Sequence, residues 1–173
     1  FAACLEALAD AGAQHIHIIA HSMGNRLLIN VLDRIGQNTT PIGARLAQLV
    51  FAAPDVDQIR FRQVLSGLSN TRFATRATLY ASRTDRALQL SRLFHFGQPR
   101  AGDVTPPNVV ILQGVDTLDM TNANTDSLGH SVYSDQRAVL GDLNALIRHN
   151  AEPPRFGLQE DSVDAVGRYW RFR

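Results

Sequence analysis

The chain has 173 residues, 45% of them hydrophobic, which is enough for one globular domain with a sizeable core. A formal net charge of +1, from 17 basic and 16 acidic residues, gives no electrostatic basis for binding nucleic acid or an anionic membrane. The single cysteine, Cys4, excludes an internal disulfide and a cysteine-based metal cluster, and no apolar run reaches the ~20 residues of a membrane-spanning helix.

Two periodicities alternate along the chain, one typical of strands and one typical of helices. In chain order we predict a helix over 1–11, a strand over 15–20, a helix over 25–35, a strand over 46–53, a helix over 58–65, a strand over 77–81, a helix over 87–94, an interrupted strand over 109–112 and 115–120, and a closing helix over 136–149. We expect the strand over 15–20 to be a buried parallel strand. The alternation predicts an α/β fold, with a mostly parallel sheet and helices on both faces.

The chain divides into a predicted domain and a tail. We expect residues 1–150 to form the α/β domain and residues 151–173 to follow it as a tail that carries prolines and charges and ends in the sequence YWRFR. Because large aromatic side chains are unfavourable in water, we expect this tail to pack on the domain.

A candidate nucleophile lies where the first predicted strand meets the following helix, in the sequence AHSMG at positions 20–24. A sharp strand-to-helix turn exposes a serine hydroxyl above the sheet edge, and it needs small residues such as Ala20 and Gly24 on either side. We therefore predict Ser22 as a nucleophile, with the backbone amide of Met23 as one oxyanion donor at the start of the helix. The alternative is that Ser22 only caps the helix, because serine is a preferred cap.

A serine nucleophile needs a histidine base that a carboxylate holds in the right tautomer. His130 follows the last predicted strand and precedes the closing helix, so a loop could carry its imidazole over Ser22. Asp85 lies just beyond the third predicted strand and is the predicted acid. Asp55 and Asp57, which follow the second predicted strand, are the alternatives, because some hydrolases place the carboxylate one strand earlier.

Four segments follow one another along the chain: IIAHSMGNR at 18–26, AAPDVD at 52–57, YASRTDRAL at 80–88 and GHS at 129–131. In this order they resemble a family of bacterial α/β hydrolases classified as a domain of unknown function, relatives of esterases and lipases. The resemblance implies an α/β-hydrolase fold and a catalytic triad of Ser22, Asp85 and His130, and it leaves the substrate open.

The resemblance also implies that part of the domain is missing. Hydrolases of this kind place several strands before the nucleophile strand, whereas only a helix precedes it in this sequence. We therefore expect the chain to be the C-terminal portion of the fold, with the N-terminal strands missing and the N-terminal half of the same domain as its partner. The second oxyanion amide normally comes from that region.

The leading interpretation is a serine hydrolase of the esterase or lipase type that acts on a small-molecule acyl or ester substrate. Leu93, Phe94 and Phe96 are candidate walls of a hydrophobic pocket, although core packing explains them equally well. This chemistry needs no metal or organic cofactor. A serine peptidase or acyltransferase would share the same machinery, and a catalytically silent module that keeps the fold for binding is the alternative of a different class. Localisation is left open by the sequence.

Overall fold

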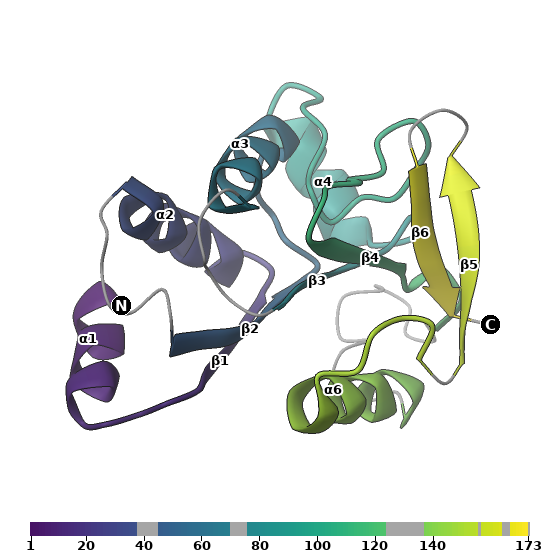
Figure 1. Cartoon of the computed structure of the whole chain (residues 1–173). Coiled ribbons are helices and arrows are strands. Elements are labelled where there is room, and N and C mark those ends of the chain that lie inside the picture. The colour runs from purple at the N-terminus through teal and green to yellow at the C-terminus, as the bar shows by residue number, and fades with distance from the viewer. Residues whose placement is uncertain (38–44, 70–75, 124–136, 156, 164–166, 173) are drawn as a thin grey trace.

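One six-stranded sheet organises the molecule, with the strand order β1-β2-β3-β4-β6-β5 (Figure 1). The computed structural model describes residues 1–37, 45–69, 76–123, 137–155, 157–163 and 167–172. The strands are β1 (Ile16–His21), β2 (Leu46–Ala52), β3 (Arg76–Ala81), β4 (Val115–Asp119), β5 (Leu158–Val163) and β6 (Gly167–Phe172). The helices are α1 (Ala2–Asp10), α2 (Gly24–Gln37), α3 (Gln58–Ser69), α4 (Arg86–Phe94), the 3-10 turn η2 (Thr121–Ala123) and α6 (Arg137–His149).

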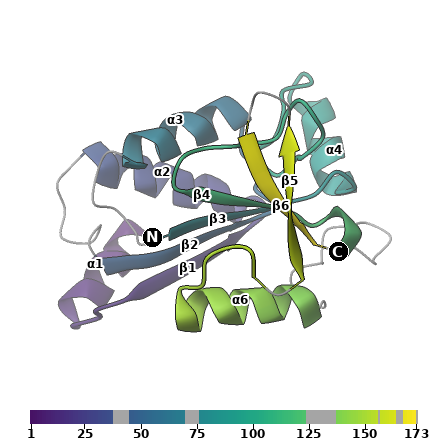
Figure 2. The ribbon, with the colours of Figure 1, turned by 45° about the vertical axis from the view of Figure 1, so that its right-hand side comes forward.

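The predicted α/β architecture is confirmed. Strands β1 to β4 pair in parallel, each with the next along the chain. Helices α2, α3 and α4 lie over one face of the sheet and α6 lies over the other (Figure 2). All seven residues of β2 are buried, as expected for a strand with neighbours on both sides and helices on both faces.

Hydrophobic contacts fill the space on each side of the sheet. On the side of α2 and α3, the rings of Phe51 and Phe61 meet edge to face, with their centroids 5.0 Å apart, and both side chains are fully buried. On the other side, Leu118, Leu146 and Phe172 belong to a second buried cluster, which joins α6 to the C-terminal strands. The two clusters together hold the helices against the sheet.

Strand β1 differs from the prediction of a buried strand. Ile16, Ile18 and Ala20 face the core, but the side chains between them are exposed, including Ile19, which is 52% exposed. The reason is the position of β1 at the end of the sheet, since an end strand has a neighbour on one side alone and can leave one face uncovered.

The chain after α4 also differs from the prediction. The strand predicted over 109–112 is absent, and Leu112 makes only an isolated bridge with Val115 at the start of β4. Within the segment expected to pack on the domain, β5 and β6 extend the sheet, because they pair with each other in antiparallel and β6 pairs with β4 in parallel. Tyr169 and Phe172 are each only 2% exposed, so this pairing buries these two aromatic side chains.

A buried polar cluster ties α6 to the sheet and to the chain that follows the helix. Asp142 in α6 accepts hydrogen bonds from Tyr80 in β3 and from Arg155, whose Nη2 lies 3.0 Å from Asp142 Oδ2. Asp142 is 3% exposed and Arg155 is 5% exposed. Burial, and then the charge of Asp142, raise the pKa of Tyr80 well above its ordinary value, so its hydroxyl remains a donor.

Removing Asp142 should therefore destabilise the fold strongly. Asp142→Ala leaves the buried guanidinium of Arg155 without its carboxylate, and we expect the free energy of unfolding in urea to fall by about 3–5 kcal/mol. The matched control is Glu160→Ala, which removes an exposed ion pair with Arg168 and should change stability by no more than about 1 kcal/mol. Equal effects of the two substitutions would contradict this account.

Candidate active site

Ser22 lies in the turn between β1 and α2, with a backbone φ of +50°. This left-handed conformation is uncommon for a residue other than glycine and costs on the order of 1–3 kcal/mol. The residue is partly exposed, although Ala20 and Asn25 around it are buried. The turn therefore holds Ser22 in a strained backbone conformation at the carboxyl end of β1.

Hydrogen bonds from three directions hold this turn. The backbone N–H of Ser22 donates to the carbonyl of Ala52 in β2 at 2.9 Å. The carbonyl of Ser22 accepts from the backbone N–H of Asn25 at 3.1 Å and from that of Asp55 at 3.3 Å. The strained residue is thus bound to both α2 and the chain after β2.

The Asn25 side chain reinforces the turn and was not singled out from the sequence. It is fully buried, and its amide nitrogen lies 3.2 Å from the carbonyl of Ala20, 3.0 Å from that of Ser22 and 3.2 Å from that of Ala52. Asn25 is one helical turn before the buried Leu28, on the side of α2 that faces the core. The sequence signal for such a role is a polar residue on a helix face that is otherwise apolar, because a buried polar side chain needs hydrogen-bond partners.

Met23 lies immediately before α2, so its backbone amide is at the positive end of the helix. The first N–H groups of a helix have no partner within it and can bind an anion. The side chain of Met23 is 64% exposed and does not enclose the turn. This arrangement suits the predicted role of the Met23 amide as an oxyanion donor.

Asp85 lies between β3 and α4, where it caps the helix. Its Oδ1 accepts from the backbone N–H of Leu88 at 3.0 Å, and the residue is 1% exposed. Because β1, β2 and β3 are parallel neighbours, their carboxyl ends lie at the same edge of the sheet. Ser22 and Asp85 therefore both follow strands at that edge, on either side of the chain that leaves β2.

The predicted base, His130, falls within residues 124–136, outside the part of the chain that the structure describes. Its place beside Ser22 and Asp85 stays a prediction.

The two alternative acids are both engaged in other contacts. Asp57 Oδ1 accepts from the backbone N–H of Arg60 at 3.0 Å, in the first turn of α3. Asp55 is 6% exposed, and both of its carboxylate oxygens are in use. Its Oδ1 accepts from Ser91 Oγ at 2.6 Å and Arg100 Nε at 2.8 Å, and its Oδ2 accepts from Arg26 Nη2 at 2.7 Å. Asp55 thus has both carboxylate oxygens engaged by side chains, whereas Asp57 and Asp85 each cap the helix that follows them.

Asp55 is a strongly stabilised anion. Burial by itself raises its pKa, but the hydrogen bond from Ser91 and the charges of Arg100 and Arg26 outweigh burial and lower the pKa below its ordinary value of 3.8. The carboxylate therefore stays charged throughout the neutral and mildly acidic range.

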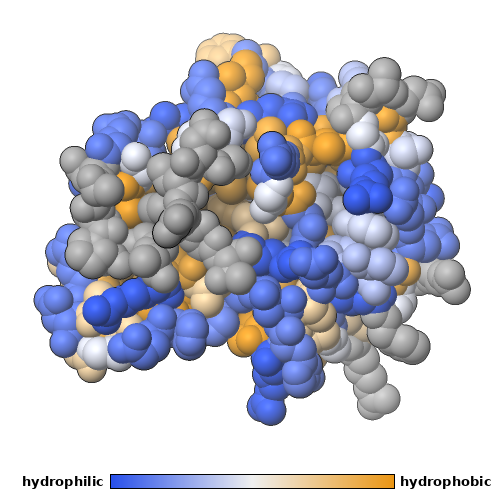
Figure 3. Space-filling model, viewed as in Figure 1, coloured by the Kyte–Doolittle hydropathy of each residue, from blue (hydrophilic) through white to orange (hydrophobic). Residues whose placement is uncertain are grey.

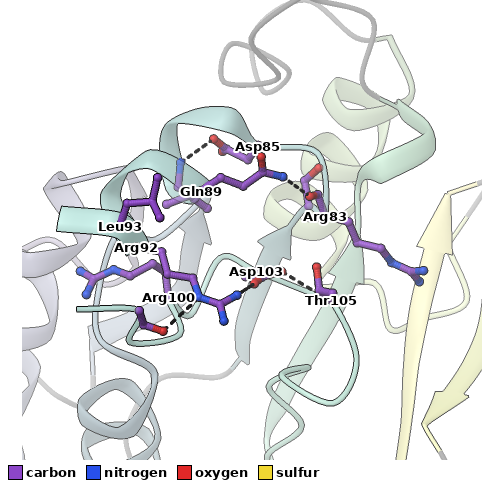
Figure 4. A pocket seen from close by; sticks show the side chains of 11 residues that line it. Arg83, Asp85, Gln89, Arg92, Leu93, Arg100, Asp103 and Thr105 are labelled. Atoms are coloured by element: carbon purple, nitrogen blue, oxygen red, sulfur yellow. Dashed lines mark hydrogen bonds and ion pairs between the residues drawn. The ribbon is translucent and has the colours of Figure 1, made fainter. Parts of the chain in front are cut away.

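A cavity of about 490 Å³ lies between α4 and the loop 97–105 (Figure 4). Asp85, Leu88 and Leu93 are among the lining residues, whereas Ser22 is not. The loop packs closely on the chain after β2, because a Cβ added at Gly102 would lie 2.9 Å from backbone atoms of that chain. The cavity thus adjoins the predicted acid and not the predicted nucleophile.

Of the three predicted pocket residues, Leu93 lines this cavity. Phe94 is 75% exposed and Phe96 is 98% exposed, so neither packs in the core. Hydrophobic surface is visible over α3 and α4 in Figure 3.

Among the described residues, no three His, Cys, Asp or Glu side chains are grouped to hold a metal ion. None of the described helices has the length and apolar character needed to cross a membrane.

Comparison with known proteins identifies one family. A family model described as an alpha/beta hydrolase of unknown function matches residues 1–149. Searches of the curated proteins and of the solved structures gave no match.

The stability that Asp55 contributes should depend on pH. Its folded-state pKa is lowered, so the contribution is present above the unfolded value of 3.8 and is lost as the pH falls through the folded-state pKa. Asp55→Asn should lower the free energy of unfolding by about 3 kcal/mol at neutral pH, and this deficit should shrink as the pH falls below 3.8. Urea unfolding over this range measures the deficit. A deficit that stays constant with pH would contradict the lowered pKa.

Proposed function

The chain belongs to the family of α/β hydrolases of unknown function that matches it, and on this premise we propose that it is a serine hydrolase of the esterase or lipase type. Ser22 is the nucleophile, His130 is the general base, and Asp85 orients the histidine. The substrate is a small molecule with an ester or related carbonyl.

The observation that carries this proposal is the backbone of Ser22. A serine that only caps a helix has an extended backbone, with its side chain turned back to the first N–H groups. Ser22 instead has a φ of +50°, and its turn is held by the hydrogen bond that its N–H donates to β2 and by those that its carbonyl accepts from Asn25 and Asp55. Strain of this kind persists only where the surroundings enforce it, and it is typical of catalytic turns.

The mechanism follows from these positions. Ser22 Oγ attacks the carbonyl carbon of the substrate while His130 takes the hydroxyl proton, and the Met23 amide donates to the oxygen that becomes negative. The intermediate collapses as the bond to the alcohol breaks, and His130 gives its proton to the departing alkoxide. Water, deprotonated by His130, then attacks the acyl-serine; the bond to Ser22 Oγ breaks, His130 returns the proton to that oxygen, and the acid is released.

Asp85 suits the part of the orienting acid for two reasons. It is buried at the carboxyl edge of the sheet, and a carboxylate can accept several hydrogen bonds, so the contact with Leu88 is compatible with one to an imidazole N–H. Asp55 is less suited, because two guanidinium groups and a hydroxyl already occupy its two oxygens.

Substitution of the nucleophile tests the proposal directly. Ser22→Ala should reduce hydrolysis of p-nitrophenyl esters of graded chain length on the order of 10⁶-fold, to the background rate. A fluorophosphonate probe should label the wild-type protein at Ser22, as located by mass spectrometry. Ser66→Ala, an exposed serine of α3, is the control and should keep full activity. Folded wild-type protein that shows neither turnover nor labelling would instead favour a catalytically silent binding module.

Two matched helix caps distinguish the candidate acids. Asn is as good a cap as Asp, so Asp85→Asn and Asp57→Asn should each keep its helix while losing the negative charge. We expect Asp85→Asn to lower kcat by about 10⁴-fold, because the histidine is then no longer held in the productive tautomer. Asp57→Asn should stay close to the wild-type kcat. The opposite result would assign the acid to the chain after β2.

A further inference from the structure

The environment of Asp55 joins the two halves of the proposed active site. Its carboxylate is bonded to Arg26 in α2, to Ser91 in α4 and to Arg100 in the loop 97–105. A carboxylate with so little exposure is stable in the folded protein only because these partners replace its water. Such a cluster fixes the segments that carry its members relative to one another.

The first half of the contact network ends at the nucleophile turn. The backbone N–H of Asp55 donates to the carbonyl of Ser22 at 3.3 Å. Arg26, in the first turn of α2, contacts Asp55 twice. Its Nε donates to the Asp55 carbonyl at 2.8 Å, and its Nη2 donates to the Asp55 carboxylate. Arg100 Nη2 donates to the same carbonyl at 2.9 Å. The backbone and the side chain of Asp55 are therefore both fixed by arginines, and Asp55 in turn fixes the position of the start of α2.

The second half of the network ends at the helix of the predicted acid. Ser91 lies in α4, and Asp85 is the N-cap of that helix. A short α-helix moves as one body, since each turn is hydrogen-bonded to the next. The 2.6 Å hydrogen bond from Ser91 Oγ to Asp55 Oδ1 thus limits the position of Asp85 as well.

We propose that Asp55, together with Arg26, Arg100 and Ser91, is a positioning cluster that sets the spacing between the Ser22 turn and the helix of Asp85. This inference rests on the proposed function. Asp55, Arg26 and Ser91 act through Ser22 and Asp85, and Arg100 also lines the cavity beside α4. The cluster also opposes relaxation of the strained Ser22 backbone, because Asp55 is hydrogen-bonded both to the Ser22 carbonyl and to Arg26 in the first turn of α2.

Ser91 offers the cleanest test, because its hydroxyl links α4 to Asp55 while both ion pairs stay in place. Ser91→Ala should lower kcat for a p-nitrophenyl ester by about 10- to 100-fold, the scale expected for a shift of about 1 Å, with KM within about twofold. Ser91→Thr keeps the hydroxyl and should restore kcat. Asp33→Asn breaks the 2.6 Å ion pair between α2 and Arg60 of α3 and should leave kcat unchanged.

A pH profile separates positioning from general loss of structure. A carboxylate beside an imidazole raises the pKa of that imidazole, so a displaced Asp85 should shift the acid limb of kcat/KM to lower pH in Ser91→Ala and leave it unshifted in Asp33→Asn. Arg100→Lys is the second variant. It keeps the charge but cannot hold the carboxylate and the carbonyl of Asp55 together, and we expect the same shift.

The outcomes distinguish this inference from the proposed function. Fluorophosphonate-reactive wild-type protein, with a wild-type kcat and pH profile in both Ser91→Ala and Arg100→Lys, would overturn the positioning cluster alone. Wild-type protein that neither reacts with the probe nor turns over ester would overturn the serine hydrolase and the cluster with it.

Discussion

The parallel pairing of β1, β2 and β3 is the constraint on which the rest of the structure depends. Each strand enters the sheet from the same side, so each leaves at the same edge, and the chain segments after the three strands meet there. Ser22, Asp55 and Asp85 lie in these three segments. Residues 63 positions apart in the sequence, from 22 to 85, thus come to one edge.

The strained backbone conformation of Ser22 is stable in the folded protein because several hydrogen bonds hold the surrounding turn in place. The +50° φ would relax in an isolated chain, but the peptide is bonded to Ala52 on one side and to Asn25 and Asp55 on the other. Asn25 adds three side-chain contacts from a fully buried position. Hydrogen bonds are directional, so the buried polar groups around the turn specify one backbone conformation, which hydrophobic packing does not do.

Two buried carboxylates tie distant parts of the fold together at different places. Asp55 joins the segments around the Ser22 turn, and Asp142 joins α6 to β3 and to Arg155. Each carboxylate has arginine partners, which is the condition for keeping a charge away from water. The cluster around Asp142 belongs to the face of the sheet where β5 and β6 close the second hydrophobic core.

The sequence by itself determined the succession of strands and helices through β4, the α/β class and the turn that contains Ser22, because periodicity and turn chemistry are local properties of the chain. Only the tertiary structure decided that β1 is an end strand with an exposed face and that residues 158–172 join β4 through β6. It also decided that Asp55 pairs with Ser91 and Arg100, 36 and 45 positions away. These features depend on contacts between segments far apart in the chain, and no local pattern specifies which partner a strand edge or a carboxylate will meet.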